Sequence, residues 1–514
     1  MLRPEFYPHR PAVVQLVQTH ISYVFLAGAH VYKMKKAVRF SFLDFATLDR
    51  RRHFCREEVR LNRRLAPDVY FGVMAICRSG ADYWLGEEDN PAAIEYAVHM
   101  RRLPEDRILA RLLDRDQAGP GLIDAIARRL AEFHRDADAG PEVTANGDPQ
   151  AIAAVMEDDF AEERPFRGRT ISTSDDDAVQ QFCRNFLMRN DAFLRTRQAE
   201  HRIRDGHGDL HAEHVCCTDG LIIFDCIEFN ATFRHRDVAA DVAFLAMDLD
   251  YHGHPELAGH LIARYAVYAG DPSLRRLVPF YACYRAYVRG KVDSLKSTEP
   301  EVAPADREAA QRSASRHFAL AYRYTWAYSP CLVVIAGLSG TGKSAIAAAL
   351  QGRTGFVHFN SDVIRKQLDA TPPHANGYET GRYAPEITAR TYETMLACAD
   401  GHLAAGRGVI LDATFQRRAP RDAVRALAAQ RRVPFLVVEC RCSEDEVRRR
   451  LSQRARDGAT VSEADWTVYA EQRRRYEQFG AEEQQDRVVV DTATAAPIDV
   501  AGRIEAALRL RSGL

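Results

Sequence analysis

The eight residues from Gly337 to Ser344, GLSGTGKS, match the pattern G-x-x-x-x-G-K-[ST] in full. They follow an apolar, strand-like run and precede an alanine-rich segment, which is the context that a phosphate-binding loop requires. We predict that Lys343 reaches the β and γ phosphates of ATP, which also contact backbone N–H groups, and that Ser344 holds Mg²⁺. The expected cofactor-binding residues are Gly337, Ser339, Gly340, Thr341, Gly342, Lys343 and Ser344.

The next apolar run ends in Asn360-Ser361-Asp362, and Arg365 follows three residues later. Here the chain resembles polynucleotide kinases, zeta-type toxins and related small-molecule P-loop kinases. The resemblance implies that Asp362 accepts the proton of the attacking hydroxyl and that Arg365 binds the acceptor. A carboxylate suits this place because it can orient a weak nucleophile in line with the γ phosphate. The alternative is that Asp362 only caps the following helix.

Two further segments extend this resemblance. Asp412 ends another apolar run and is similar to the acidic strand end that lies beside the acceptor or the metal in these kinases, although an aspartate there can also cap a turn. The arginine-rich stretch 448–456 looks like their mobile lid, and we expect Arg450 and Arg454 to contact the transferring phosphoryl group. The alternative is the solvated face of a charged helix.

The N-terminal half carries a second constellation, HGDLHAEH over residues 207–214, followed by an apolar run that ends in Asp225. It resembles the catalytic loop and metal strand of aminoglycoside phosphotransferases and other kinase-like folds. The resemblance implies that Asp209 orients the substrate hydroxyl and that Asp225 holds Mg²⁺. His207 and Asp241 are interpreted as residues that stabilise the loop.

Other parts of the same resemblance lie further upstream. It implies that Lys33 binds phosphate and pairs with Glu58, with Lys35 and Glu57 as the second choice. The segment 96–100 resembles the hinge where adenine would lie. The stretches 224–230, 234–237 and 241–248 resemble bacterial phosphotransferase-like proteins that are fused to a P-loop kinase domain. This resemblance covers nearly the whole chain, in order as well as in motif.

One position departs from the family pattern, which places a metal-binding Asn five residues after the catalytic Asp. This chain has His214 there, and a neutral imidazole favours softer ions than Mg²⁺. His214 remains a candidate metal ligand, and weakened catalysis, a one-metal site and a degenerate kinase are all open. His211, His214, Cys216 and Cys217 could also form a transition-metal cluster, but their spacing matches no standard zinc pattern.

The elements that position these residues are predicted from hydrophobic patterning. After a proline-containing break at 297–304, five short apolar runs alternate with helical stretches, which indicates a parallel sheet covered by helices. These runs are 332–336, 356–359, 409–411, 435–438 and 488–490. In the opening hundred residues, strand-like runs at 23–26 and 31–34 turn at Gly28 and precede a helical pattern around 54–65.

We therefore predict an α/β and α+β protein with a bilobal, protein-kinase-like fold followed by a P-loop α/β fold. The expected domains are residues 1–300, with a small lobe to about 100 and a large lobe to 300, a linker helix at 301–329, and a P-loop domain at 330–514. The polar stretches 136–150 and 169–177 are interpreted as loops inside the large lobe.

Bulk properties limit the possible partners. The 70 Lys and Arg against 71 Asp and Glu give a formal net charge of −1, so no overall field selects nucleic acid or a membrane surface. The N-terminal residues lack the apolar core of a signal peptide and no run has the length of a membrane span, so we expect a cytoplasmic location. The 11 scattered cysteines are expected to be reduced thiols.

The sequence thus predicts an ATP- and Mg²⁺-dependent kinase with two nucleotide sites and a small-molecule acceptor, such as a sugar, a nucleoside or an antibiotic-like alcohol. A first alternative is a nucleic-acid 5′-hydroxyl kinase, suggested by Asp362, Arg365 and the arginines at 473–475. A second is an ATP-binding regulatory protein whose N-terminal half no longer transfers phosphate. The acceptor and the oligomeric state stay open.

Overall fold

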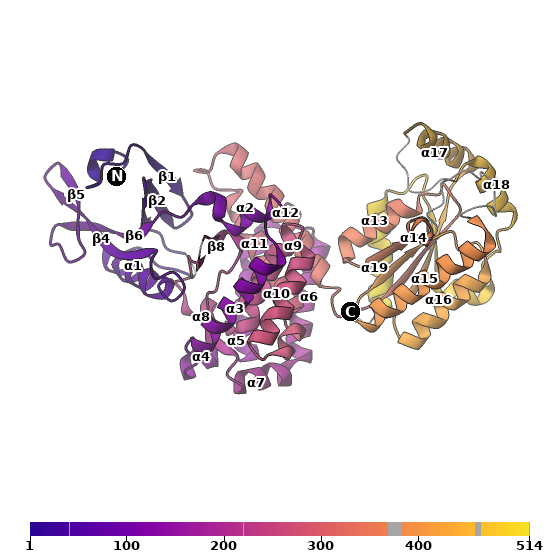
Figure 1. Ribbon diagram of the computed structural model, residues 1–514, viewed down its shortest axis with the longest axis horizontal. Coiled ribbons are helices and arrows are strands. Elements are labelled where there is room, and N and C mark those ends of the chain that lie inside the picture. Colours follow the sequence, from indigo (N-terminus) through magenta and orange to yellow (C-terminus); the bar gives the residue numbers. More distant parts are fainter. Residues whose placement is uncertain (41, 219, 369–382, 458–463, 513–514) are drawn as a thin grey trace. The chain divides into compact units, whose positions relative to one another are not determined.

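The computed structural model describes residues 1–40, 42–218, 220–368, 383–457 and 464–512. The chain forms two compact units, Met1–Ala321 and Tyr322–Leu514 (Figure 1). The division falls inside the helix α12 (Pro304–Tyr324), in the segment expected to link two domains. Among the helices described, none combines the length and the hydropathy that crossing a bilayer requires.

The first unit begins with a six-stranded antiparallel sheet in the order β1-β2-β3-β6-β4-β5. Gly28, at a φ of +64°, makes the turn between β2 and β3. Helix α1 begins after Thr47, whose side chain accepts from the backbone N–H of Arg50, and its buried face packs on the sheet. The elements are β1 (Val14–Gln18), β2 (Ser22–Ala27), β3 (His30–Lys35), α1 (Leu48–Asn62), β4 (Tyr70–Ser79), β5 (Asp82–Glu87) and β6 (Ala93–Arg101).

A mainly helical lobe follows, with short strands around the predicted catalytic loop. Its helices are α2 (Leu109–Leu113), α3 (Pro120–Asp136), α4 (Pro141–Ala145), α5 (Pro149–Glu163), α6 (Thr173–Arg189), α7 (Asp191–Ala199), α8 (Ala231–Arg234), α9 (Val238–Tyr251), α10 (Pro255–Tyr268) and α11 (Val278–Lys296). Its strands are β7 (Ile203–Asp205), β8 (Val215–Cys217), β9 (Leu221–Ile223) and β10 (His235–Asp237). Helix α9 packs against α10 and α11 and is buried over most of its length.

The two stretches interpreted as loops in this lobe were predicted incorrectly. The stretch 136–150 contains all of α4 and the start of α5, and 169–177 contains the start of α6. Both longer helices have side-chain caps, because Asp148 accepts from the backbone N–H of Gln150 and Ser172 from that of Asp175. The polar residues therefore mark helix N-termini rather than open loops.

The second unit is built on a parallel five-stranded sheet in the order β12-β13-β11-β14-β15, with helices on both faces (Figure 1). Its strands are β11 (Leu332–Ala336), β12 (Val357–Asn360), β13 (Val409–Asp412), β14 (Phe435–Arg441) and β15 (Arg487–Asp491). Its helices are α13 (Lys343–Thr354), α14 (Ser361–Leu368), α15 (Pro385–Ala404), α16 (Arg418–Arg431), α17 (Glu444–Asp457), α18 (Trp466–Arg474) and α19 (Pro497–Ser512). The predicted α+β and α/β architecture is confirmed: a sheet lobe and a helical lobe precede a parallel sheet covered by helices.

A buried carboxyl group joins α5 to α11 and to the segment before α6 in the first unit. Glu163, at the end of α5, is 0% exposed, and its Oε1 accepts from the hydroxyls of Thr170 and Ser294 at 3.4 Å. Its Oε2 has no hydrogen-bond partner among the described residues. Burial, and then the Asp176 carboxylate, raise the pKa of Glu163 from 4.5 to about 8. The group is therefore protonated in the folded protein near neutral pH, since an unpaired buried charge is costly.

Glu163→Gln is expected to remove a pH dependence of stability. In the wild type, the folded protein keeps a proton on Glu163 that the unfolded chain loses. The contribution of Glu163 to the free energy of unfolding is therefore complete below pH 4.5 and is lost as the pH rises through about 8. Relative to the Gln variant, the wild-type free energy of unfolding should fall by roughly 2–4 kcal/mol between about pH 5 and pH 8. Denaturant unfolding of the first unit at each pH measures this change in the free energy of unfolding. The exposed Glu142→Gln is the control, and equal pH slopes in wild type and Glu163→Gln would contradict the prediction.

Candidate functional site

The loop between β11 and α13 has the backbone geometry of a phosphate cradle. Gly337, Gly340 and Gly342 have φ values of +144°, +81° and +86°, which side chains rarely permit. A Cβ at Gly337 would lie 2.6 Å from the backbone carbonyl oxygen of Cys440. Lys343 follows as the first residue of α13, and its Nζ donates to the carbonyl of Leu338 at 3.0 Å. Backbone amides, a helix start and an ammonium group therefore meet here.

Side chains from the strands β12 and β13 and from the helix α13 meet beside this loop. The Ser344 hydroxyl donates to Oδ2 of Asp412 at 2.7 Å, and the amide of Asn360 donates to the same oxygen at 2.7 Å. Burial acts to raise the pKa of Asp412, but the His358 ring, whose Nε2 lies 3.4 Å from Oδ2, and the charge of Lys343 outweigh burial and hold the pKa below its ordinary value. An ionised carboxylate beside a hydroxyl is an oxygen donor pair that suits Mg²⁺.

Asp362 and Arg365 lie in the first two turns of α14 and form an ion pair, with Nη1 of Arg365 2.5 Å from Oδ1 of Asp362. The alternative role of Asp362 as a helix cap is wrong. Asn360 is the cap, because its Oδ1 accepts from the backbone N–H groups of Asp362 and Val363 at 2.9 and 3.2 Å. The Asp362 carboxylate is thereby left to face the site.

These groups line one cavity of about 340 Å³. Its wall contains loop residues from Ser339 to Ser344 together with Asp362, Arg365 and Asp412. The sequence analysis did not identify its other side, which includes Thr388 and Tyr392 of α15, Thr414, Pro420 of α16 and Gln472 of α18. Gln472 accepts from the backbone N–H of Ser339 at 3.0 Å and so supports the loop. No short motif marks the residues of α15, α16 and α18, because these helices lie far apart in the sequence.

The two predicted lid arginines have different surroundings. Arg454 of α17 lines the cavity. Arg450 lies against the loop near Gly342, but its guanidinium donates to Glu446 and to the carbonyl of Thr492, each at 2.7 Å. Residues 458–463, next to the predicted lid, lie outside the described part of the chain. Among the arginines at 473–475, Arg473 pairs with Glu444, whereas Arg474 and Arg475 share Glu471, so two carboxylates offset three positive charges in part.

In the first unit, two lysines of β3 share one glutamate of α1. Nζ of Lys33 lies 2.9 Å from Glu58 and 2.6 Å from Asp225. Nζ of Lys35 is fully buried, 2.7 Å from Glu58, and also pairs with Glu228. Burial acts to lower the pKa of Lys33, but Asp225 and Glu58 raise it well above its ordinary value. Sequence reasoning did not identify Glu228 as a site residue.

Two upstream expectations differ from the structure. The second-choice pair of Lys35 with Glu57 is not formed, because Glu57 pairs with Arg60 while Lys35 contacts Glu58. The segment 96–100, expected to form the hinge, lies inside β6 and pairs with β3 and β4. The chain therefore leaves the sheet only after Arg101.

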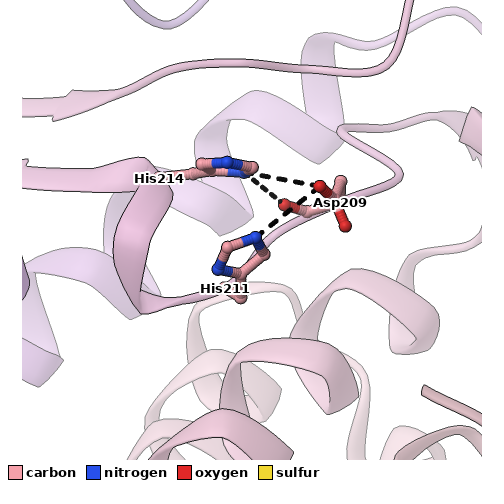
Figure 2. Close-up of side chains that lie close together, drawn as sticks. All are labelled: Asp209, His211 and His214. Carbon is pink, nitrogen blue, oxygen red and sulfur yellow. Dashed lines mark hydrogen bonds and ion pairs between the residues drawn. The ribbon is translucent and has the colours of Figure 1, made fainter. Parts of the chain in front are cut away.

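The predicted catalytic loop brings Asp209, His211 and His214 together (Figure 2). Oδ2 of Asp209 lies 3.6 Å from Nε2 of His211 and 3.7 Å from Nδ1 of His214, and His214 Nε2 lies 3.5 Å from Asp225. Burial acts to raise the pKa of Asp209, but the charge of His211 lowers it well below its usual range. Burial, and then His211, lower the pKa of His214. Asp209 is thus an ionised carboxylate.

The surrounding residues have the structural roles expected of them. Both oxygens of Asp241 accept from backbone N–H groups, those of His207 and Gly208, at 2.7 and 2.9 Å. The ring of His207 is 2.9 Å from the carbonyl of Phe224. Cys216 and Cys217 are buried in β8, and the group of potential metal ligands found among the described residues contains neither. All 11 cysteines are free thiols.

Comparisons with known proteins agree with this organisation. The sequence model of a family described as "AAA domain" matches residues 332–479. Proteins named "Uncharacterized protein Rv2004c" of Mycobacterium tuberculosis and "Uncharacterized protein Mb2027c" of Mycobacterium bovis are each 30% identical over 448 residues, which cover 86% of this chain and 86% of theirs. The second unit is thus a P-loop domain, and the relatives share both units.

Solved structures with some likeness include a choline/ethanolamine kinase family protein from Mesorhizobium loti, 14% identical, with a TM-score of 0.35 and coverage of 61% of this chain and 95% of that one. Another is an APS kinase of Mycobacterium tuberculosis in complex with AMPPNP and APS, 20% identical, with a TM-score of 0.25 and coverage of 35% and 98%.

Gly337→Ala is expected to lower the affinity of the second unit for a fluorescent ATP analogue at least about tenfold, because a Cβ collides with a backbone carbonyl at a φ that alanine avoids. The titration is made in a Lys33→Ala background so that it reports the P-loop. Gly352→Ala is the control, since this helical glycine is exposed and has open space around it. Unchanged affinity in a folded Gly337→Ala protein would refute the predicted cradle.

Proposed function

The chain belongs to the protein family that includes Rv2004c of Mycobacterium tuberculosis, and for this two-unit member we propose an ATP- and Mg²⁺-dependent phosphotransferase with two kinase sites. Each site transfers the γ phosphate of ATP to a hydroxyl group of a small molecule. The acceptor class is a sugar, a nucleoside or an antibiotic-like alcohol, and the protein acts in the cytoplasm.

One observation carries the proposal for the second unit. A single cavity of about 340 Å³ joins the phosphate loop to Asp362 and Arg365. A nucleotide binding loop alone is compatible with switches, motors and synthases. A carboxylate and a guanidinium placed beside the loop add what a phosphoryl acceptor needs, namely a proton acceptor and an anchor.

The proposed reaction in this cavity uses the residues as follows. Asp362 orients the acceptor hydroxyl and takes its proton as the new bond between oxygen and the γ phosphorus forms and the bond to the β,γ-bridging oxygen breaks. Lys343 and Arg454 face the negative charge of the transferring group. Ser344 and Asp412 fit Mg²⁺ because both offer oxygen, and the ion, when bound, neutralises phosphate charge.

In the first unit, the proposed roles fall to Asp209 as the base and Lys33 as the phosphate ligand. The ion pairs of Lys33 with Glu58 and Asp225 support this assignment, because they hold the ammonium group rigidly beside the predicted metal carboxylate. The low pKa of Asp209 supports it as well, since a base must be ionised at neutral pH. The proposed domain limits are those predicted from the sequence.

A screen of a metabolite extract tests both sites at once. We expect wild type to produce compounds that gain the mass of one phosphate in the presence of ATP. Products of the second unit should disappear in Lys343→Ala, and products of the first unit in Asp209→Ala. Asp362→Asn should slow the second reaction about 100-fold or more because it removes the proton acceptor, whereas the exposed Asp499→Asn should not.

Three outcomes would change the proposal. Products that persist in all three site variants would exclude both sites as the source. ATP binding without any product, unaffected by Asp209→Asn, would favour the regulatory alternative for the first unit. Phosphate transfer to 5′-hydroxyl oligonucleotides that is lost in Asp362→Ala would identify a nucleic-acid end kinase.

A further inference from the structure

The two ring nitrogens of His214 have different surroundings. Nδ1 lies 2.8 Å from the backbone carbonyl oxygen of Asp209. Because a carbonyl oxygen can only accept, Nδ1 carries the proton of this hydrogen bond, which also fixes the orientation of the ring. Nε2 is turned to the other side, where it lies 3.5 Å from Oδ2 of Asp225.

This contact between His214 and Asp225 is not a hydrogen bond. A protonated imidazole would approach a carboxylate to about 2.7–2.9 Å, whereas Nε2 and Oδ2 are 3.5 Å apart. In the neutral ring, Nε2 presents a lone pair. The other oxygen of Asp225, Oδ1, already accepts from Lys33 Nζ at 2.6 Å. A lone pair thus faces a carboxylate oxygen, and a cation between the two atoms would stabilise both.

The separation also suits a shared metal ion. Two nitrogen or oxygen ligands at about 2.0–2.2 Å from one ion, at angles of roughly 90–110°, lie about 2.8–3.6 Å apart. The His214–Asp225 distance falls in this range. The hydrogen bond from Nδ1 to a backbone carbonyl is the kind of outer contact that commonly orients a metal-binding histidine.

Asp209 lies on the side of the other ring nitrogen of His214, Nδ1, and His211 lies beside Asp209. Figure 2 shows both imidazoles turned toward the Asp209 carboxylate. His211 Nε2 is 3.6 Å from Asp209 Oδ2, and one ligand atom from each of the three residues lies within 4.8 Å of the others. His211 is buried, and the two aspartates place two negative charges around the imidazoles.

We propose that Nε2 of His214 and Oδ2 of Asp225 bind a divalent transition-metal ion such as Mn²⁺, Co²⁺ or Zn²⁺, in preference to Mg²⁺. Imidazole nitrogen suits these ions, whereas Mg²⁺ prefers oxygen ligands and retains its water. The site is distinct from the oxygen pair of Ser344 and Asp412 in the second unit. That the first unit uses such an ion in catalysis rests on the proposed function, but binding of the ion does not.

Manganese bound to the full-length protein without nucleotide provides a test that needs no variant. We expect the electron spin echo of bound Mn²⁺ to show coupling to imidazole nitrogen, because an all-oxygen site cannot produce it. Bound Mn²⁺ without nitrogen coupling, or no binding in the presence of excess Mg²⁺, would overturn the proposal.

Cobalt titrations of matched variants then assign the ligands. His214→Asn, which replaces the nitrogen ligand by an amide, should weaken Co²⁺ binding by about 10- to 100-fold without weakening Mg²⁺ binding. Asp225→Asn should also weaken Co²⁺ binding. His201→Asn is the control, since His201 is exposed and has a φ of +56°, which asparagine accepts. Equal Co²⁺ affinity in all folded variants would contradict the ligand set.

Activity measurements separate this inference from the proposed function. Transfer by the first unit, measured in Lys343→Ala, is expected to be faster with Mn²⁺ than with Mg²⁺, and His214→Asn should reverse the order. Nitrogen coupling with no transfer under any ion would support the metal site and count against catalysis by this unit. Transfer with Mg²⁺ alone and no nitrogen coupling would support catalysis and overturn the metal site.

Discussion

The parallel pairing of β11, β12 and β13 is the constraint on which the second site depends. Parallel strands end at the same edge of a sheet, and the register places Ile335 and Asn360 opposite Asp412. The phosphate loop begins at this edge because it follows β11 directly. Hydrogen bonds from Ser344 and Asn360 to Asp412 then join the ends of β12 and β13 to the start of α13. Residues far apart in the sequence thereby share one wall of the cavity.

In the first unit, buried ion pairs bring residues that are distant in the sequence together at the site. Lys33 and Lys35 lie two residues apart on β3, so both side chains point to the same side of the sheet. They join the sheet to Glu58 of α1 and to Asp225 and Glu228 of the segment after β9. Burying these charges costs free energy that good pairing must offset. Removal of one partner would therefore leave an uncompensated charge in the interior.

The sequence predicted those parts of the fold and sites that local patterns encode. The phosphate loop follows from eight consecutive residues, and the five parallel strands follow from their apolar runs. Contacts between distant segments could not be predicted in this way. Nothing local distinguishes Gln472 or Tyr392 as cavity residues. Glu58, by contrast, was preferred to Glu57 as the partner of Lys33, and the structure contains the Lys33–Glu58 ion pair. Polar stretches that cap helices also resemble loops until the structure shows the cap.

Asn360 limits how this site can diverge in evolution. Its Oδ1 caps α14, the helix that carries Asp362 and Arg365, while its Nδ2 holds Asp412. A substitution there would disturb α14 and the Asp412 carboxylate together, so that side of the cavity has little mutational freedom. On the opposite wall lie Thr388 of α15 and Pro420 of α16. In the contacts described, neither residue holds two elements of the site as Asn360 does. New acceptor preferences would therefore arise more readily on that wall, with the chemistry left intact.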